Sequence, residues 1–464
     1  MIKTGRLLVA GAMFMIGGCA LLPPDRLAND VRQIVRSQSS SDPQWRRGAV
    51  TDAARARARA LAADGVTIDD AVEIALLLNP DVQLEFEQLG FESAAALATA
   101  APRGLDVEWA ELGVRGGPGS KTEFAVLWSI ADLLASPARR SAARRRLDAA
   151  RYATAERLLD FIAEVRKAWL DAVAAEQRQR LSAQRADLGR LAAELAQRYR
   201  EAGNLSVAEA ARHRLVWGER QSEAAAAAAQ RDAARLRLAR LMAFDELDDR
   251  WEYSGGVPQL PATEPDAVEL ETAALSNRLD VAASRKLVEA YAIERRRAPL
   301  LGALSAPKAG YSRERESNGA DLRGWSVQFE LPLVTTAQLA AAQRDANARR
   351  ALRAAEATAL DARAAVRAAR QNLERARAAV ILWRDLRLPA TRTIAAAEQR
   401  HLFYMLVGPF DAMDARAAAL QAEAELIGAM RDYWHARLDL ARAAALPLQA
   451  VHDSGTAASA GEER

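Results

Sequence analysis

The chain has 464 residues, and its 64 lysines and arginines nearly balance its 61 aspartates and glutamates. A net charge of only +3 excludes the strongly basic surface that is expected of a nucleic-acid-binding protein. Half of the residues are hydrophobic but only 5% are aromatic, and the abundance of Ala and Arg predicts long helices.

Residues 1–18 have the pattern of a signal peptide, with a basic start and an apolar stretch, Leu7 to Ile16, that is too short to span a bilayer. The only cysteine, Cys19, follows directly and excludes an internal disulfide. Ile16-Gly17-Gly18-Cys19 resembles a bacterial lipobox, which implies that Cys19 is lipidated, and Ala20 favours delivery to the outer membrane. More than one acyl chain, such as palmitate, would anchor the protein stably. The alternative is an ordinary signal peptide with a chance cysteine.

The remaining chain divides by composition into a linker, two repeats and a tail. Residues 19–65 are predicted to form a lipidated N-terminal linker with a short helix near 49–63. The first repeat covers 66–265 and the second 266–446, and 447–464 are predicted to be disordered. Each repeat begins with a pair of helices; in the first, Thr67 caps a helix that Asn79-Pro80 interrupts.

Each repeat then changes from helical periodicity to alternation of large apolar residues with small or polar ones. The strands of the first β-hairpin are predicted at about 104–131, around a Gly/Pro-rich turn at 116–119. The second hairpin covers about 309–332 and turns at Ser317-Asn318-Gly319. From alternation alone, the first hairpin could equally lie on a soluble core.

Long helical hairpins with apolar residues every three or four positions follow, at about 137–243 and 337–446. Pro389 should kink or break the helix that contains it. The run Ala224 to Ala229 either allows close helix packing or simply reflects the high helix propensity of alanine. The turns align without gaps when Tyr199, Gly203 and Ser206 are matched with Tyr404, Gly408 and Asp411.

Four strands cannot close a barrel, and open sheet edges cannot face lipid, so strands in a membrane would have to come from several chains. Over residues 66–446 the order of these features, with Leu331-Pro332-Leu333 ending the last strand, resembles TolC-like outer-membrane efflux proteins. The resemblance implies a mainly α-helical chain with a small β part. It also implies a homotrimeric duct with a twelve-stranded β-barrel in the outer-membrane lipid and a helical barrel in the periplasm, docked to a periplasmic adaptor (membrane fusion) protein and an inner-membrane transporter.

Asp411 and Asp414 are three residues apart on a predicted helix and therefore share a face. In a trimer each would form a ring of three carboxylates, and the resemblance implies that these rings are the periplasmic gate, which attracts cations and repels anions. The alternative is that Asp411 caps the returning helix. The tips are expected to contact the adaptor, and both glycines can adopt a positive φ where the turn needs it. The tip residues are Gly203, Asn204, Leu205, Ser206, Gly408, Pro409 and Phe410.

The rival function is a lipid-tethered periplasmic coiled-coil scaffold or adaptor without a pore. It accounts for the helices and the lipobox, but not for two matched hairpins that each precede a long helix. An enzyme is a more distant alternative, because no nucleophile, phosphate-binding loop or metal-ligand spacing among the four histidines is present. We therefore expect no enzymatic activity, no metal and no cofactor. The sequence does not identify the cargo.

Overall fold

The computed structural model describes residues 24–101, 106–113, 120–244, 251–261, 267–296, 308–328 and 336–448. The predicted lipidation site, Cys19, lies outside these residues, as do Leu331-Pro332-Leu333 and most of the predicted tail. None of the described helices combines the length and the hydropathy needed to cross a lipid bilayer.

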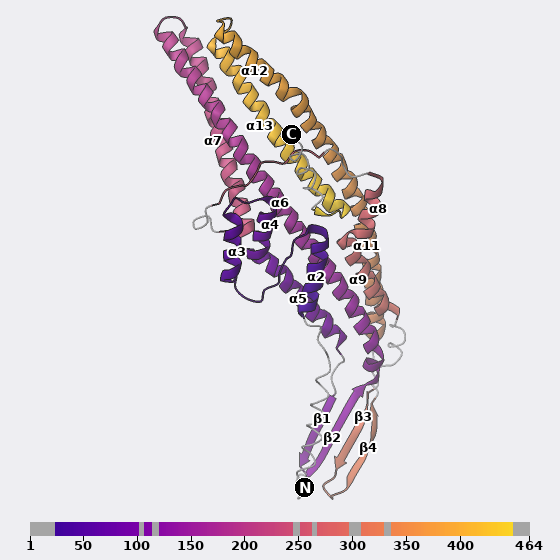
Figure 1. Cartoon of the computed structure of the whole chain (residues 1–464). Coiled ribbons are helices and arrows are strands. Elements are labelled where there is room, and N and C mark those ends of the chain that lie inside the picture. Colours follow the sequence, from indigo (N-terminus) through magenta and orange to yellow (C-terminus); the bar gives the residue numbers. More distant parts are fainter. Residues whose placement is uncertain are drawn as a thin grey trace, which may run out of the picture. The chain divides into compact units, whose positions relative to one another are not determined.

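The two predicted repeats are present and follow the predicted order of elements (Figure 1). The first consists of helices α4 (Ile68–Leu78) and α5 (Pro80–Ala100), strands β1 (Asp106–Gly113) and β2 (Ser120–Ser129), and helices α6 (Ile130–Glu201) and α7 (Val207–Met242). The second consists of α8 (Ala267–Asn277), α9 (Leu279–Arg296), β3 (Lys308–Arg315), β4 (Asp321–Gln328), α11 (Thr336–Ile381), α12 (Leu388–Phe403) and α13 (Pro409–Ala444). The predicted fold class is therefore confirmed for the single chain.

Within the described residues, two helices precede the repeats. The predicted short helix is α3 (Asp52–Ala62), whose first turn is capped by the Thr51 side chain. Helix α2 (Pro24–Ser39) is not anticipated by the sequence analysis, because its polar composition hides an apolar stripe. Leu27, Val31 and Val35 recur every four residues on one face of α2, and all three are buried.

The chain forms two compact units. The first contains Met1–Val31, Phe86–Thr154 and Leu279–Leu360, and the second contains Arg32–Glu85, Ala155–Arg278 and Asp361–Arg464. The first unit therefore includes the whole β-sheet, and the second includes the ends of both helical hairpins.

In the first unit, the hairpins of the two repeats join into one antiparallel sheet with the strand order β1-β2-β3-β4 (Figure 1). One row of directly paired residues across the sheet is Val107, Val126, Tyr311 and Trp325. These apolar side chains share one face, because successive residues of a strand point to opposite faces. Trp325 is 81% exposed. The next row, on the opposite face, is Glu108, Ala125, Ser312 and Gly324, which are small or polar.

Gly310 makes the pairing between the two repeats possible. It lies opposite Leu127 on β2 and is buried. A Cβ atom at this position would overlap the Val126 carbonyl oxygen and lie 2.8 Å from the Leu127 Cα atom. Both are backbone atoms, which cannot move aside as a flexible side chain can. The close approach of β2 and β3 therefore requires glycine at this position.

In the second unit, both repeats have a hydrogen bond from the junction of their first two helices to the end of their last helix. The buried Asn79 side chain, between α4 and α5, donates a 2.8 Å hydrogen bond to the carbonyl of Leu241 near the end of α7. Arg278, between α8 and α9, donates a 3.2 Å hydrogen bond to the carbonyl of Ala443 near the end of α13. The two repeats thus share this connection although the donor residues differ.

The long helices differ from the sequence prediction at two prolines. Helix α6 begins at Ile130, before the predicted start, and contains Pro137 without ending. Pro389 neither breaks nor ends the second long helix, because a π-helical segment, Leu382–Arg387, joins α11 to α12. There the Leu388 amide bonds to the Trp383 carbonyl, five residues back, and Pro389 lies in the first turn of α12. The π-turn thus changes the hydrogen-bond register immediately before Pro389, which has no backbone N–H to donate.

Candidate functional site

The candidate site lies at the ends of the two helical hairpins in the second unit. Both turns close in the same way: Gly203 and Asn204 donate to the carbonyls of Arg200 and Tyr199, at 3.0 and 2.8 Å. Met405 and Leu406 make the equivalent bonds to Leu402 and His401, at 3.0 and 2.9 Å. This pair of bonds is a Schellman motif, which requires a positive φ at its first donor. That φ is 79° at Gly203 and 59° at Met405.

This geometry corrects the sequence alignment of the turns. Adding 202 to a residue number in the first turn gives its counterpart in the second, so Gly203 corresponds to Met405, Ser206 to Gly408 and Glu209 to Asp411. The same difference relates the last residues of the returning helices, Met242 and Ala444. The sequence alignment instead matched Gly203 with Gly408, because both follow a tyrosine by four residues. Gly408 does not use its freedom to adopt a positive φ, since its φ is −74°.

Asp411 lies in the first turn of α13, where its carboxylate accepts a 3.2 Å hydrogen bond from the Gly408 amide. Glu209 occupies the same position in α7, where it accepts hydrogen bonds from the hydroxyl and the amide of Ser206, at 2.6 and 3.0 Å. These bonds from Ser206, side chain first, hold the pKa of Glu209 below its ordinary value. Both acids therefore act as helix caps, which was the alternative role considered for Asp411.

Asp414 instead connects the two hairpins. Its Oδ1 atom accepts a 2.8 Å ion-pair hydrogen bond from Nη2 of Arg220 on α7. The Arg220 side chain is only 14% exposed, whereas that of Asp414 is 62% exposed. The other terminal nitrogen of Arg220, Nη1, is buried without a hydrogen-bond partner among the described residues. Asp411 and Asp414 are thus close in sequence but differ in role.

Phe410 also lies against the first hairpin. Its ring stacks on His213 of α7 with the centroids 4.1 Å apart, and it meets the Tyr199 ring of α6 edge-on at 6.0 Å. Phe410 is half-buried by these contacts. The start of α13 thus contacts the first hairpin in two ways, through the Phe410 ring and through the Asp414–Arg220 ion pair.

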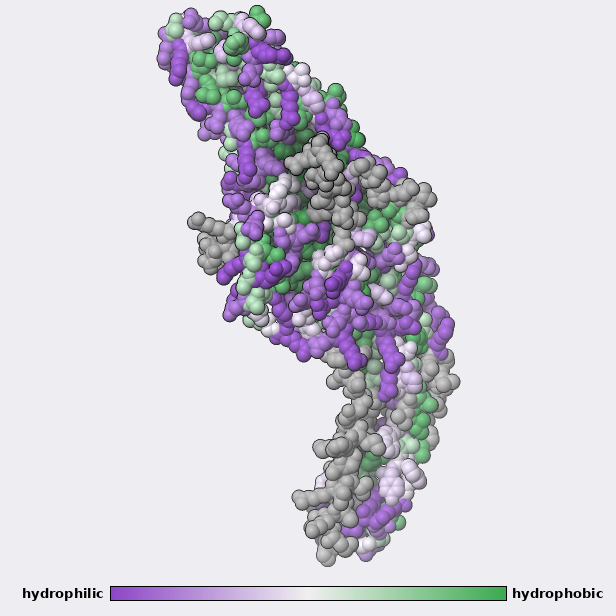
Figure 2. Space-filling model, viewed as in Figure 1, coloured by the Kyte–Doolittle hydropathy of each residue, from purple (hydrophilic) through white to green (hydrophobic). Residues whose placement is uncertain are grey.

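The residues exposed at the second turn come just before the predicted tip. Phe403, Tyr404, Met405 and Leu406 are 81%, 70%, 93% and 71% exposed. Their counterparts in the first hairpin are Glu201, Ala202, Gly203 and Asn204, which are small or polar. The sequence feature that marks this surface is four consecutive large, mainly apolar residues at the turn. They precede Gly408, the first residue of the predicted tip. Patches of hydrophobic surface lie among hydrophilic ones at this end of the hairpins (Figure 2).

No protein-family model matches the sequence, and no curated protein matches it. Solved structures do match. The outer-membrane channel OprN is 17% identical, with a TM-score of 0.66 over 88% of this chain and 94% of OprN. The outer membrane channel CmeC of Campylobacter jejuni is 14% identical, with a TM-score of 0.63 over 81% of this chain and 85% of CmeC.

A third match is a structure described as the open state of the Neisseria gonorrhoeae outer membrane channel MtrE. It is 15% identical, with a TM-score of 0.59 over 82% of this chain and 89% of MtrE. These likenesses extend along nearly the whole of each channel chain. The chain therefore has the fold of TolC-like outer-membrane channels, as the sequence analysis predicts.

Proposed function

We propose that the chain is one protomer of a homotrimeric outer-membrane duct in an efflux or secretion system. The duct passes substrates from a periplasmic adaptor and an inner-membrane transporter to the outside, without enzymatic activity. The observation that carries the proposal is the four-stranded sheet, one face of which bears exposed apolar residues from both repeats and whose strands are followed by long helices. The shared fold with three outer-membrane channels supports the same conclusion.

The open edges of this sheet support the trimer. Strands β1 and β4 are the outer strands, and each has one edge without a partner among the described strands. Unpaired backbone groups are costly in lipid, so the edges must pair with other copies. About eight strands are the minimum for a filled barrel, and three copies of four strands supply twelve. In this arrangement Trp109, Trp128 and Trp325 face the lipid, where interfacial aromatic residues are favoured.

The lipid anchor remains part of the proposal. Lipidation of Cys19 would tether each protomer to the outer membrane and leave most of its mass in the periplasm. Support comes from the lipobox-like sequence alone.

Within the duct, we assign the gate to the start of α13. The Asp414–Arg220 ion pair and the stacking of Phe410 on His213 hold the second hairpin against the first. Rings of Asp411 and Asp414 around the trimer axis would add selectivity for cations. The existence of an open state of MtrE supports a duct of this fold that opens and closes.

The adaptor is proposed to contact both turns, with the segment Phe403–Leu406 as the apolar part of the surface. Replacing Met405 with glycine should stabilise the hairpin by about 1 kcal/mol, because a non-glycine residue with positive φ is strained. The same change should weaken retention of the adaptor, because it removes the most exposed side chain of the tip. Thermal unfolding and co-purification after cross-linking measure the two effects.

The equivalent first-hairpin residue provides the matched control. Gly203→Ala should destabilise the chain by a similar amount, since φ is positive there as well. Because it removes no side chain from the tip, it should weaken adaptor retention less than Met405→Gly does. Unchanged retention in the Met405→Gly variant would remove this tip from the docking surface.

The function as a whole is tested by fractionation and electrical recording. We expect trimers that resist SDS and dissociate on heating in the outer-membrane fraction, and ion-conducting channels when purified protein is added to planar bilayers. A monomer without conductance would favour the alternative, a lipid-tethered scaffold.

A further inference from the structure

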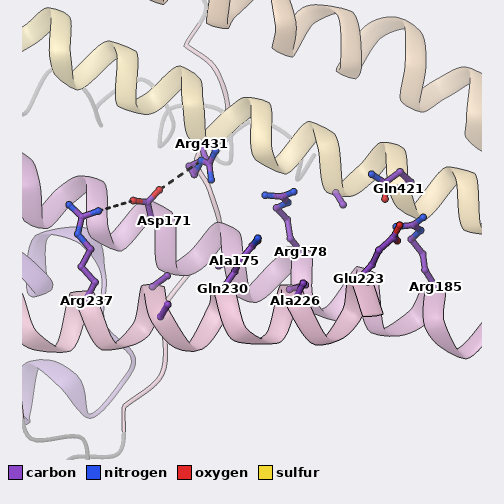
Figure 3. Close-up of a pocket in the computed structure, with 15 residues that line it drawn as sticks. Asp171, Ala175, Arg178, Arg185, Glu223, Ala226, Gln230, Arg237, Gln421 and Arg431 are labelled. Carbon is purple, nitrogen blue, oxygen red and sulfur yellow. Dashed lines mark hydrogen bonds and ion pairs between the residues drawn. The ribbon is translucent and has the colours of Figure 1, made fainter. Parts of the chain in front are cut away.

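A groove of about 590 Å³ lies in the second unit between helices α6, α7 and α13. On α6 its lining residues include Asp171, Arg178 and Arg185, which recur every seven positions and so share one helix face (Figure 3). The face extends over about 20 Å at about 1.5 Å per residue. The groove therefore has the volume and length of a small-molecule site.

Alanines line much of the groove, and larger side chains at these positions would fill it. Ala226 and Ala227, from the alanine run noted in the sequence, line it from α7. Ala175 lines it from α6 and Ala424 from α13. These methyl groups leave the space between the three helices unfilled and give it an apolar floor.

The charges along the groove are unevenly paired. At one end Asp171 pairs with Arg237 and Arg431, at 3.7 and 3.8 Å. At the other end Arg185 pairs with Glu223 at 3.0 Å.

Between these pairs, Arg178 extends from α6 into the groove (Figure 3). It has no ion pair or hydrogen bond within the described part of the chain. Arg237 also pairs with Glu164 and Arg431 with Asp432, at 3.3 and 2.6 Å. Among the described residues, Arg178 is thus the arginine of the groove that has no carboxylate partner.

We infer that the groove binds small amphiphilic anions, with the anionic group on Arg178 and the apolar body on the alanine floor. A guanidinium can donate two parallel hydrogen bonds to a carboxylate or sulfonate. Ser182 and Gln230, which also line the groove, offer further hydrogen bonds beside it. A metal ion does not fit beside the uncompensated positive charge of Arg178. The inference goes beyond the proposed duct, since it concerns what the chain itself binds.

Equilibrium dialysis of the purified full-length protein in a neutral detergent tests the inference, with 2-naphthoate as the probe and neutral 2-naphthamide as its matched control. We expect 2-naphthoate to bind and 2-naphthamide to bind at least about tenfold more weakly, the effect of losing a hydrogen bond to a charged group. Arg178→Gln should lower the affinity for 2-naphthoate by a similar factor. Arg180→Gln should leave it unchanged, because Arg180 is exposed and bonds to Glu176 instead.

A second variant tests the floor of the groove independently of charge. Ala227→Leu should fill the space and reduce binding of 2-naphthoate while Arg178 is retained, and circular dichroism checks that each variant remains helical. The inference is overturned if the wild-type protein does not bind 2-naphthoate, if it binds the amide equally well, or if Arg178→Gln binds like the wild type. These outcomes do not depend on channel activity, so they are separable from failure of the proposed function.

Discussion

Replacing Gly310 with valine is expected to prevent formation of the SDS-resistant trimer. The new Cβ would overlap the Val126 carbonyl oxygen where β2 and β3 pair and join the two repeats. Overpacking inside a folded protein typically costs about 1–3 kcal/mol, and a clash with backbone cannot be relieved by turning a side chain. The sheet would separate into two hairpins, which are marginally stable on their own. Gel electrophoresis of outer-membrane fractions, heated and unheated, measures the loss.

Gly324 is the matched control for this change. It lies on the neighbouring strand β4, paired with Ser312, and an added Cβ would have no atom within 4 Å. Gly324→Val should therefore form trimers normally, because β-branched residues are favoured in strands. Equal assembly of the two variants would show that β2 and β3 do not pair in this register.

Breaking the ion pair at the start of α13 is expected to open the duct. Asp414→Asn and Arg220→Gln each remove the ion pair that connects the two hairpins. Ion pairs at a protein surface contribute about 0.2–1 kcal/mol, so the loss of each pair should raise the ratio of open to closed channels by up to about fivefold. Single-channel recording in planar bilayers measures this ratio and the conductance.

Two further variants distinguish two ways of gating the duct. In one, the Asp414–Arg220 ion pair holds the duct closed, as a latch; in the other, a ring of carboxylates controls the passage of ions. If the pair acts as a latch, the Arg220→Gln and Asp414→Asn double variant should behave like either single variant, since all three lack the same bond. Asp411→Asn should open the duct less, because Asp411 contacts only its own helix in the described structure. A larger effect from Asp411→Asn than from Arg220→Gln would assign gating to the carboxylate ring instead.

Local patterns in the sequence predicted most of the fold, because periodicity and turn chemistry are local properties. Alternation around Trp109 and Trp325 identified the hairpins, and Asn79-Pro80 located a helix boundary that the structure keeps. Helix α2 was missed because its few apolar residues form a stripe within a polar sequence. The pairing of β2 with β3 was not predicted either, since it depends on contacts between distant segments.

The candidate site was predicted less completely, for the same reason. The partner of Asp414 is 194 residues away in sequence, and nothing near Arg220 marks it as that partner. The contact between Phe410 and His213 is also long-range. The matching spacing of Tyr199 and Tyr404 to a following glycine suggested an alignment that the hydrogen bonds of the two turns contradict. Only the capping role of Asp411, a local interaction, could be anticipated from sequence.

The π-turn at Leu382–Arg387 has a consequence for how the two repeats are compared. A π-turn holds one residue more than an α-helical turn. Before the π-turn, equivalent residues of the two repeats differ in number by 201, which matches the buried Val165 and Ala168 with the buried Val366 and Ala369. In the turns that follow the π-turn, equivalent residues differ by 202. The second repeat thus carries an insertion hidden within a continuous helix. With the offset that applies before the π-turn, the counterpart of Arg178 is Ala379, so the duplicated hairpins have diverged in charge as well as at their tips.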